Sequence, residues 1–172
     1  MSESVEEGKD ITRGWITESA SSVKRVLDIG TGRGTYFNKF GVAGQPLHHA
    51  EWVGVEAYEP YIRVWNLTAK YHKLLNEDAR TLDYTSLGKF EIAFAGDVLE
   101  HMTKEEAIKL VADLQKCCDK IYISIPIIHL PQDADSNPFQ EHVKDDWSHE
   151  EVMESFSVKR HWAGKIVGVY EV

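Results

Sequence analysis

A short apolar run followed by alternating glycines is the feature that most constrains this chain. Residues 26–36 read VLDIGTGRGTY. The run before the glycines contains one carboxylate, Asp28, and is typical of a buried parallel strand. Gly30, Gly32 and Gly34 then allow a tight turn that a ligand can approach closely. The stretch predicts a strand that feeds a ligand-binding loop in an α/β domain, and the alternative is a tight turn that binds nothing.

A second carboxylate follows at a distance that fits the same site. Residues 51–56, EWVGVE, predict the second strand, which ends at Glu56 just over twenty residues after the glycine loop. An acid at such a strand end can accept hydrogen bonds from both hydroxyls of a ribose. Glu56 therefore indicates a nucleoside site, although it could also be a solvated charge.

The glycine spacing narrows the kind of nucleotide site. The dinucleotide fingerprint is G-x-G-x-x-G, whereas this loop reads G-x-G-x-G and has Thr35 where the third glycine of the fingerprint stands. The loop resembles motif I of class I S-adenosylmethionine-dependent methyltransferases, (V/L)LD(I/V)G-x-G-x-G. The resemblance implies that Asp28 supports the loop or the amino group of the cofactor. It also implies a loop around the methionine part of the cofactor, formed by Gly30, Thr31, Gly32 and Gly34.

Two later stretches resemble motifs of the same superfamily. Residues 76–80, NEDAR, follow a weak third strand at 72–76, and an acid there can accept from an adenine amino group; Asp78 is favoured, with Glu77 as the alternative. Residues 96–102, GDVLEHM, follow the fourth strand at 90–95 and resemble the D-x-L-E-H form common among small-molecule methyltransferases. The resemblance implies further cofactor-binding positions at Glu56, Ala57, Asp78, Ala79, Asp97 and Val98.

The implied chemistry is attack of a substrate oxygen or nitrogen on the sulfonium methyl. The cofactor is already activated, so the protein mainly supplies positioning and desolvation. A general base helps where the nucleophile is a hydroxyl, and the candidates are His101 and His129. His101 could equally be a structural histidine near a helix N-terminus. We expect no metal, because His129, Glu141 and His142 fit no compact zinc spacing.

A long stretch without periodicity follows the fifth strand, which is predicted at 120–125. Its segment SNPFQEHVKDDWSHEEV resembles the N-P-(Y/F)-x-x-H-x-x-x-W-(S/T)-x-E-E segment that helps form the substrate lid in a subset of the superfamily. Ser148 and Glu151 predict a capping box for a helix at 149–155. Thr103 and Glu106 predict another for a helix that continues to about residue 116.

These elements predict an α/β fold, a Rossmann-like doubly wound and mainly parallel seven-stranded sheet with a C-terminal antiparallel hairpin. The hairpin is expected from residues 157–162 and 165–172, and further helices from residues 11–20, 36–40 and 61–70. The prediction is a single domain over residues 1–172, of which about the first nine form a flexible tail.

Charge and composition narrow the partners. The net charge of −9 disfavours nucleic acid as a substrate, and no apolar run is long enough to span a bilayer. The acidic N-terminus does not look like a secretory signal, and the only cysteines, Cys117 and Cys118, are adjacent, which favours a cytoplasmic protein. We expect a monomer or a homodimer whose pocket is either open or completed by a second subunit.

The sequence therefore predicts an S-adenosylmethionine-dependent methyltransferase that acts on an oxygen or nitrogen of a small molecule. Residues 96–99, GDVL, stand where methyltransferases acting on nucleobases carry an N/D-P-P-Y/F tetrad. One alternative is a non-catalytic module that binds adenosylmethionine or a partner protein. The other is an NAD-linked oxidoreductase, which Thr35 argues against.

Overall fold

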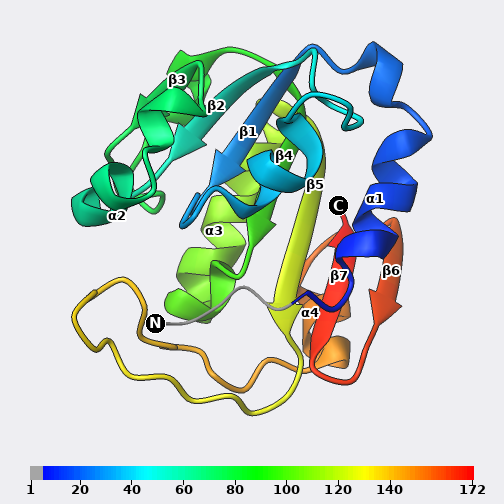
Figure 1. Cartoon of the computed structure of the whole chain (residues 1–172). Helices are drawn as coiled ribbons and strands as arrows, with labels where there is room; N and C mark the ends of the chain where they lie inside the picture. The colour runs from blue at the N-terminus through cyan, green and yellow to red at the C-terminus, as the bar shows by residue number, and fades with distance from the viewer. Residues whose placement is uncertain (1–5) are drawn as a thin grey trace.

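A computed structural model describes residues 6–172, which form one seven-stranded sheet with the strand order β3-β2-β1-β4-β5-β7-β6 (Figure 1). The first five strands along this order are parallel, and β7 is antiparallel to both β5 and β6. The predicted doubly wound, mainly parallel sheet with its C-terminal hairpin is confirmed. The strands are β1 (Arg25–Ile29), β2 (Glu51–Val55), β3 (Lys73–Leu75), β4 (Phe90–Gly96), β5 (Cys118–Pro126), β6 (Arg160–Ala163) and β7 (Val167–Glu171).

Alternate residues along the central strands bury side chains on opposite faces of the sheet. On one face, Leu27 belongs to an apolar cluster that includes Leu110 of α3 (Lys104–Gln115) and Val152 of α4 (His149–Ser155). On the other face, the neighbouring Val26 belongs to a cluster with Ile16 of α1 (Lys9–Thr17). Both faces of the sheet are therefore covered, as a parallel sheet requires.

The second crossover is shorter and more broken than predicted. In place of one helix over 61–70, the chain forms α2 (Glu59–Val64) and the 3-10 turn η3 (Leu67–Ala69). Asn66 between them has a φ of 47°, and this left-handed conformation ends the first helix. The remaining short helical turns are η1 (Ala20–Ser22), η2 (Phe37–Gly41), η4 (Tyr84–Leu87) and η5 (Leu99–His101).

One predicted capping box forms completely and the other forms in part. Thr103 and Glu106 exchange both hydrogen bonds at the start of α3. At the start of α4, Ser148 accepts from the backbone N–H of Glu151, but the Glu151 carboxylate binds Lys104 and Lys144. The second box therefore lacks its reciprocal half, because two lysines compete for the carboxylate.

The predicted tail over residues 1 to about 9 lies partly outside the described residues, and its described end is not a tail. The carboxylate of Glu7 accepts hydrogen bonds from the backbone N–H groups of Lys165, Ile166 and Val167. Lys9 begins α1 and is only 3% exposed. The prediction is wrong for Glu7 and Lys9, because their partners lie far along the chain.

Residues 127–148, here called the crossing loop, contain no helix or strand and run past the carboxyl ends of the parallel strands (Figure 1). The backbone N–H of Lys144 donates to the carbonyl of Glu100, and the hydroxyl of Tyr58 donates to the carbonyl of Ser136, each over 3.0 Å. The loop is thereby tied to both the β4 side and the β2 side of the sheet.

Within residues 6–172 no helix combines the length and the apolar character needed to cross a membrane. Cys117 and Cys118 are both buried free thiols, with their sulfur atoms 3.6 Å apart.

Candidate active site

The glycine loop is fixed at the end of β1 by the neighbouring strand. The backbone N–H groups of Gly30 and Thr31 both donate to the carbonyl of Val55. Gly30 has a φ of 63°, and a Cβ atom there would lie 2.6 Å from a methyl of Val98. Position 30 therefore needs glycine both for its backbone conformation and for its closeness to the segment after β4.

Glu56, the predicted ribose-binding acid, is 6% exposed and holds the glycine loop. Its Oε2 accepts from the backbone nitrogen of Gly32 at 2.8 Å and from the hydroxyl of Thr31 at 3.4 Å, and its Oε1 accepts from the backbone nitrogen of Tyr58 at 2.8 Å. Burial raises the pKa of Glu56, while the hydrogen bonds from Tyr58 and Gly32 oppose that rise. The acid is thus a structural anchor of the loop as well as a candidate ligand group.

Asp28 lies beneath this loop and is 1% exposed. The hydroxyl of Tyr71 donates to its Oδ2 at 2.5 Å. Burial raises the pKa of Asp28 to about 7, the bond from Tyr71 lowers it, and the charge of Glu56 raises it further. This placement fits a residue that supports the loop from below, which is one of the two roles that the resemblance implied.

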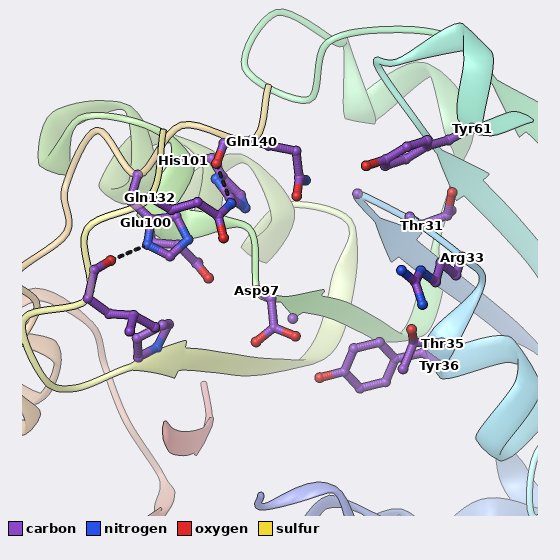
Figure 2. A pocket seen from close by; sticks show the side chains of 16 residues that line it. Thr31, Arg33, Thr35, Tyr36, Tyr61, Asp97, Glu100, His101, Gln132 and Gln140 are labelled. Carbon is purple, nitrogen blue, oxygen red and sulfur yellow. Dashed lines mark hydrogen bonds between the residues drawn. The ribbon is translucent and has the colours of Figure 1, made fainter. Parts of the chain in front are cut away.

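Two adjoining pockets form a single cleft along the carboxyl ends of β1, β2 and β4, because they share lining residues. The shared residues are Gly30, Gly32, Tyr61, Asp97, His101 and Gln140. Figure 2 shows Asp97, Glu100 and His101 on one side of the cleft, and Thr31, Arg33 and Tyr36 of the glycine loop on the other.

The pocket toward β2 brings together most of the predicted cofactor residues. Glu56, Ala57, Asp78, Ala79 and Val98 all line it. It also contains Tyr61 and Met102, which were not predicted as site residues, and Asn137, Phe139 and Gln140 of the segment that resembles a substrate lid.

Asp78, the predicted adenine-binding acid, has an internal partner. Its two carboxylate oxygens bind the Arg80 side chain, at 2.6 Å to Nη2 and 3.0 Å to Nε, and one also accepts from the Arg80 backbone nitrogen. These hydrogen bonds lower the pKa of Asp78. Asp78 lines the pocket as expected, but an adenine amino group would have to share its carboxylate with Arg80.

Asp97 follows β4 in the left-handed conformation, with a φ of 55°. Its backbone N–H donates to the carbonyl of Ser124, and its Oδ2 lies 3.5 Å from the buried ammonium of Lys9. The same ammonium lies 3.3 Å from the hydroxyl of Tyr36 and 3.4 Å from that of Ser124. The sequence did not predict that Lys9 contacts Asp97 and Tyr36 of the cleft, because nothing in the acidic segment around Lys9 indicates such a contact.

The turn η5 places Glu100 and His101 in the cleft beside His142 of the crossing loop. Burial lowers the pKa of His101, so its imidazole favours the neutral form. Glu100 is 2% exposed, and burial together with the nearby charge of Asp97 raises its pKa well above the usual range. These groups form the side of the cleft opposite the glycine loop.

His129, the second predicted base, lies elsewhere. Its imidazole is 70% exposed, and its Nε2 lies 3.2 Å from a carboxylate oxygen of Asp145. It does not line either pocket of the cleft. This position does not support the predicted role of His129 as a base.

The strand order and the glycine loop at its reversal point form a Rossmann-like doubly wound sheet, a fold shared with solved structures that include a methyltransferase. No protein-family model matches the sequence, and no curated protein matches it.

Solved structures of this fold match nearly the whole chain. The N-terminal domain of EvdMO1 with SAH bound is 17% identical with a TM-score of 0.69, over 98% of this chain and 80% of that chain. The PH0226 protein from Pyrococcus horikoshii OT3 is 17% identical with a TM-score of 0.69, over 97% and 91%. Magnesium protoporphyrin IX methyltransferase (ChlM) from Synechocystis PCC 6803 with bound SAH is 16% identical with a TM-score of 0.67, over 94% and 79%.

Proposed function

We propose that this protein is an S-adenosylmethionine-dependent methyltransferase that transfers a methyl group to an oxygen or nitrogen of a small molecule. The observation that carries the proposal is the continuity of the cleft. The loop of Gly30–Gly32 and Glu56 stands on its cofactor side, and Asp97, Glu100 and His101 line it close by. A cofactor on the glycine loop would therefore present its methyl group to polar side chains.

The pocket toward β2 suits the adenosine half of the cofactor. Glu56 offers an acceptor for a ribose hydroxyl, and Ala79, Val98 and Met102 provide an apolar lining for a base. The methionine half would then lie toward Arg33, whose cation can attract its carboxylate.

Solved structures of the same fold support this choice of cofactor. The N-terminal domain of EvdMO1 and ChlM were both solved with SAH, and ChlM also with SAM. MmcR is a mitomycin 7-O-methyltransferase, which agrees with a small-molecule acceptor. The net charge of −9 also favours such an acceptor over a nucleic acid.

The chemistry is an in-line displacement. The acceptor atom forms a bond to the methyl carbon while the bond from that carbon to sulfur breaks, and S-adenosylhomocysteine leaves. An acceptor hydroxyl must also lose its proton, and His101, which is predominantly neutral and lines the cleft, is the candidate group on this side.

Isothermal titration with S-adenosylmethionine and S-adenosylhomocysteine tests the proposal. We expect binding that Glu56→Ala weakens by about 1–3 kcal/mol, because a charged acceptor is lost. Glu51→Gln at the exposed start of β2 is the matched control and should bind as the wild type does. Absence of binding to the wild type would overturn the proposal, and tighter binding of NADH would favour the oxidoreductase.

Turnover separates an enzyme from a binding module. We expect S-adenosylhomocysteine to accumulate when the protein is incubated with S-adenosylmethionine and a panel of hydroxylated and amino small molecules. Binding without any turnover across such a panel would favour the non-catalytic module.

A further inference from the structure

Three metal-ligating side chains meet on the side of the cleft opposite the glycine loop. Glu100 and His101 belong to η5 after β4, and His142 belongs to the crossing loop after β5. One ligand atom from each lies within 4.8 Å of the other two. All three line the same pocket, where Figure 2 shows Glu100 and His101 next to each other.

Both imidazoles are oriented by backbone carbonyls. The Nδ1 atom of His101 lies 3.1 Å from the carbonyl oxygen of Glu141, and the Nδ1 atom of His142 lies 2.5 Å from that of Leu130. A carbonyl only accepts, so each Nδ1 carries the hydrogen, and an imidazole that is protonated on Nδ1 alone offers its lone pair at Nε2. Histidines that bind metals are held in this way, with the second ring nitrogen donating to a carbonyl or a carboxylate.

One oxygen of the Glu100 carboxyl group lacks a hydrogen-bond partner among residues 6–172. Glu100 is 2% exposed, and this oxygen, Oε2, is buried. A buried polar atom without a partner destabilises the folded protein, because its desolvation is not compensated. A cation bound at this atom would provide that compensation.

We propose that Glu100, His101 and His142 bind one divalent cation of the kind that prefers imidazole, such as Zn²⁺ or Co²⁺. Two imidazoles and one carboxylate suit these ions, whereas Mg²⁺ and Ca²⁺ prefer oxygen ligands. Two ligands on one such ion lie about 3–4 Å apart. The ligand atoms of the three side chains therefore need to approach one another by about 1 Å. A small shift of His142 in the crossing loop can provide this approach.

From the sequence we expected no metal, because His129, Glu141 and His142 fit no compact zinc spacing. In the structure, His129 pairs with Asp145 on the surface, and Glu141 contributes its backbone carbonyl to His101. His142 follows His101 by 41 residues and Glu100 by 42 residues, so the three ligands form no compact spacing in the sequence.

Three protein ligands leave coordination positions open toward the cleft. If the chain is the proposed methyltransferase, an acceptor hydroxyl can occupy one of them. The cation lowers the pKa of that hydroxyl, and its proton passes to solvent water. The oxygen then bonds to the methyl carbon as the carbon–sulfur bond breaks. In this scheme His101 acts as a ligand instead of as the base.

Titration of the chelator-treated full-length protein with Co²⁺, followed by its visible d–d bands and by calorimetry, tests the site. We expect one equivalent to bind to the wild type. Glu100→Gln and His142→Ala should each weaken binding by at least about 100-fold, because even partners of the ligands contribute 10–100-fold. His129→Ala, which removes another histidine beside an acid, should bind as the wild type does.

Two outcomes would overturn the proposal. One is wild-type affinity no tighter than that of His142→Ala, with circular dichroism showing both folded. The other is strong thiolate charge-transfer absorption, which would place the ion on Cys117 and Cys118. If the protein binds the metal but not S-adenosylhomocysteine, the proposed function is wrong and the metal site is retained. If it binds S-adenosylhomocysteine but not the metal, the metal site is wrong and the proposed function is retained.

Discussion

The carboxylate of Glu56 lies 2.8 Å from the backbone nitrogen of Gly32 and so joins the end of β2 to the glycine loop. Because the same carboxylate also accepts from Tyr58, replacing it affects the protein even without ligand. We expect Glu56→Gln to lower the free energy of unfolding of the ligand-free protein by about 1–3 kcal/mol, since an amide cannot accept all these bonds. Urea denaturation measures this loss. If Glu56→Gln is as stable as the wild type and only ligand binding weakens, the anchoring role is wrong.

Asp28 gives the stability of the protein a pH dependence of known sign. Its carboxyl ionises near pH 4 in an unfolded chain, but burial raises its folded pKa to about 7, with Tyr71, Glu56 and Lys9 facing it. Between these values unfolding releases a proton, so stability falls as pH rises. Relative to Asp28→Asn, we expect the wild type to lose up to about 4 kcal/mol between pH 4 and pH 8.

Denaturation of both Asp28 proteins over this pH range provides the measurement. Asparagine keeps an acceptor for the Tyr71 hydroxyl, so the comparison isolates the charge. Parallel stability curves for the two proteins would contradict the assignment of the titration to Asp28.

Because Gly54 in β2 has no side chain, Thr31 of the glycine loop and Tyr71 can pack closely against it. A Cβ atom there would lie 2.8 Å from a methyl of Thr31 and 2.9 Å from both Leu74 and Tyr71. We expect Gly54→Ala to destabilise the protein by about 1–3 kcal/mol through overpacking. Gly14→Ala in α1 is the control, because no atom lies within 4 Å of its Cβ position; it should instead stabilise by about 0.5–1 kcal/mol. Equal effects of the two substitutions in urea denaturation would refute the steric explanation.

Lys9 links α1 to the cleft. Its ammonium lies within hydrogen-bond distance of Tyr36, Asp97 and Ser124, so Lys9→Met removes one donor from each of these groups. The expected loss in the free energy of unfolding is about 1–3 kcal/mol, below the full cost of breaking a buried ion pair, because Asp97 is partly exposed. Lys24→Met, on the surface, should change stability by less than about 0.5 kcal/mol. A Lys9→Met protein as stable as the Lys24→Met control would show that α1 is held by its apolar face alone.

The parts of the structure that the sequence predicted are those encoded by neighbouring residues. The apolar run around Val26 and Leu27, the glycine turn and the capping box of Thr103 with Glu106 are local signals, and each has its counterpart in the structure. The broken helix at Asn66 was missed, because a left-handed residue inside an apolar pattern leaves little trace in the sequence.

The sequence predicted which strand ends carry the acids of the cleft, but it did not predict the residues that hold these acids in place. Glu56 and Asp97 follow strands, and strand ends meet at one edge of a parallel sheet. By contrast, the partners Lys9 of Asp97 and Tyr71 of Asp28 come from 88 and 43 residues away. Contacts of this kind depend on how distant segments pack, and no pattern within one segment encodes them.

The crossing loop has a kinetic consequence. The hydroxyl of Tyr58 donates to the carbonyl of Ser136, and Asn137 and Phe139 of the same loop line the pocket proposed for adenosine, so the loop would partly cover a nucleoside bound there. If the chain is the proposed methyltransferase, the loop would have to separate from Tyr58 before the spent cofactor could leave, and this opening would lengthen its residence time. A protein with the proposed activity would then release S-adenosylhomocysteine slowly, and this product would inhibit further turnover.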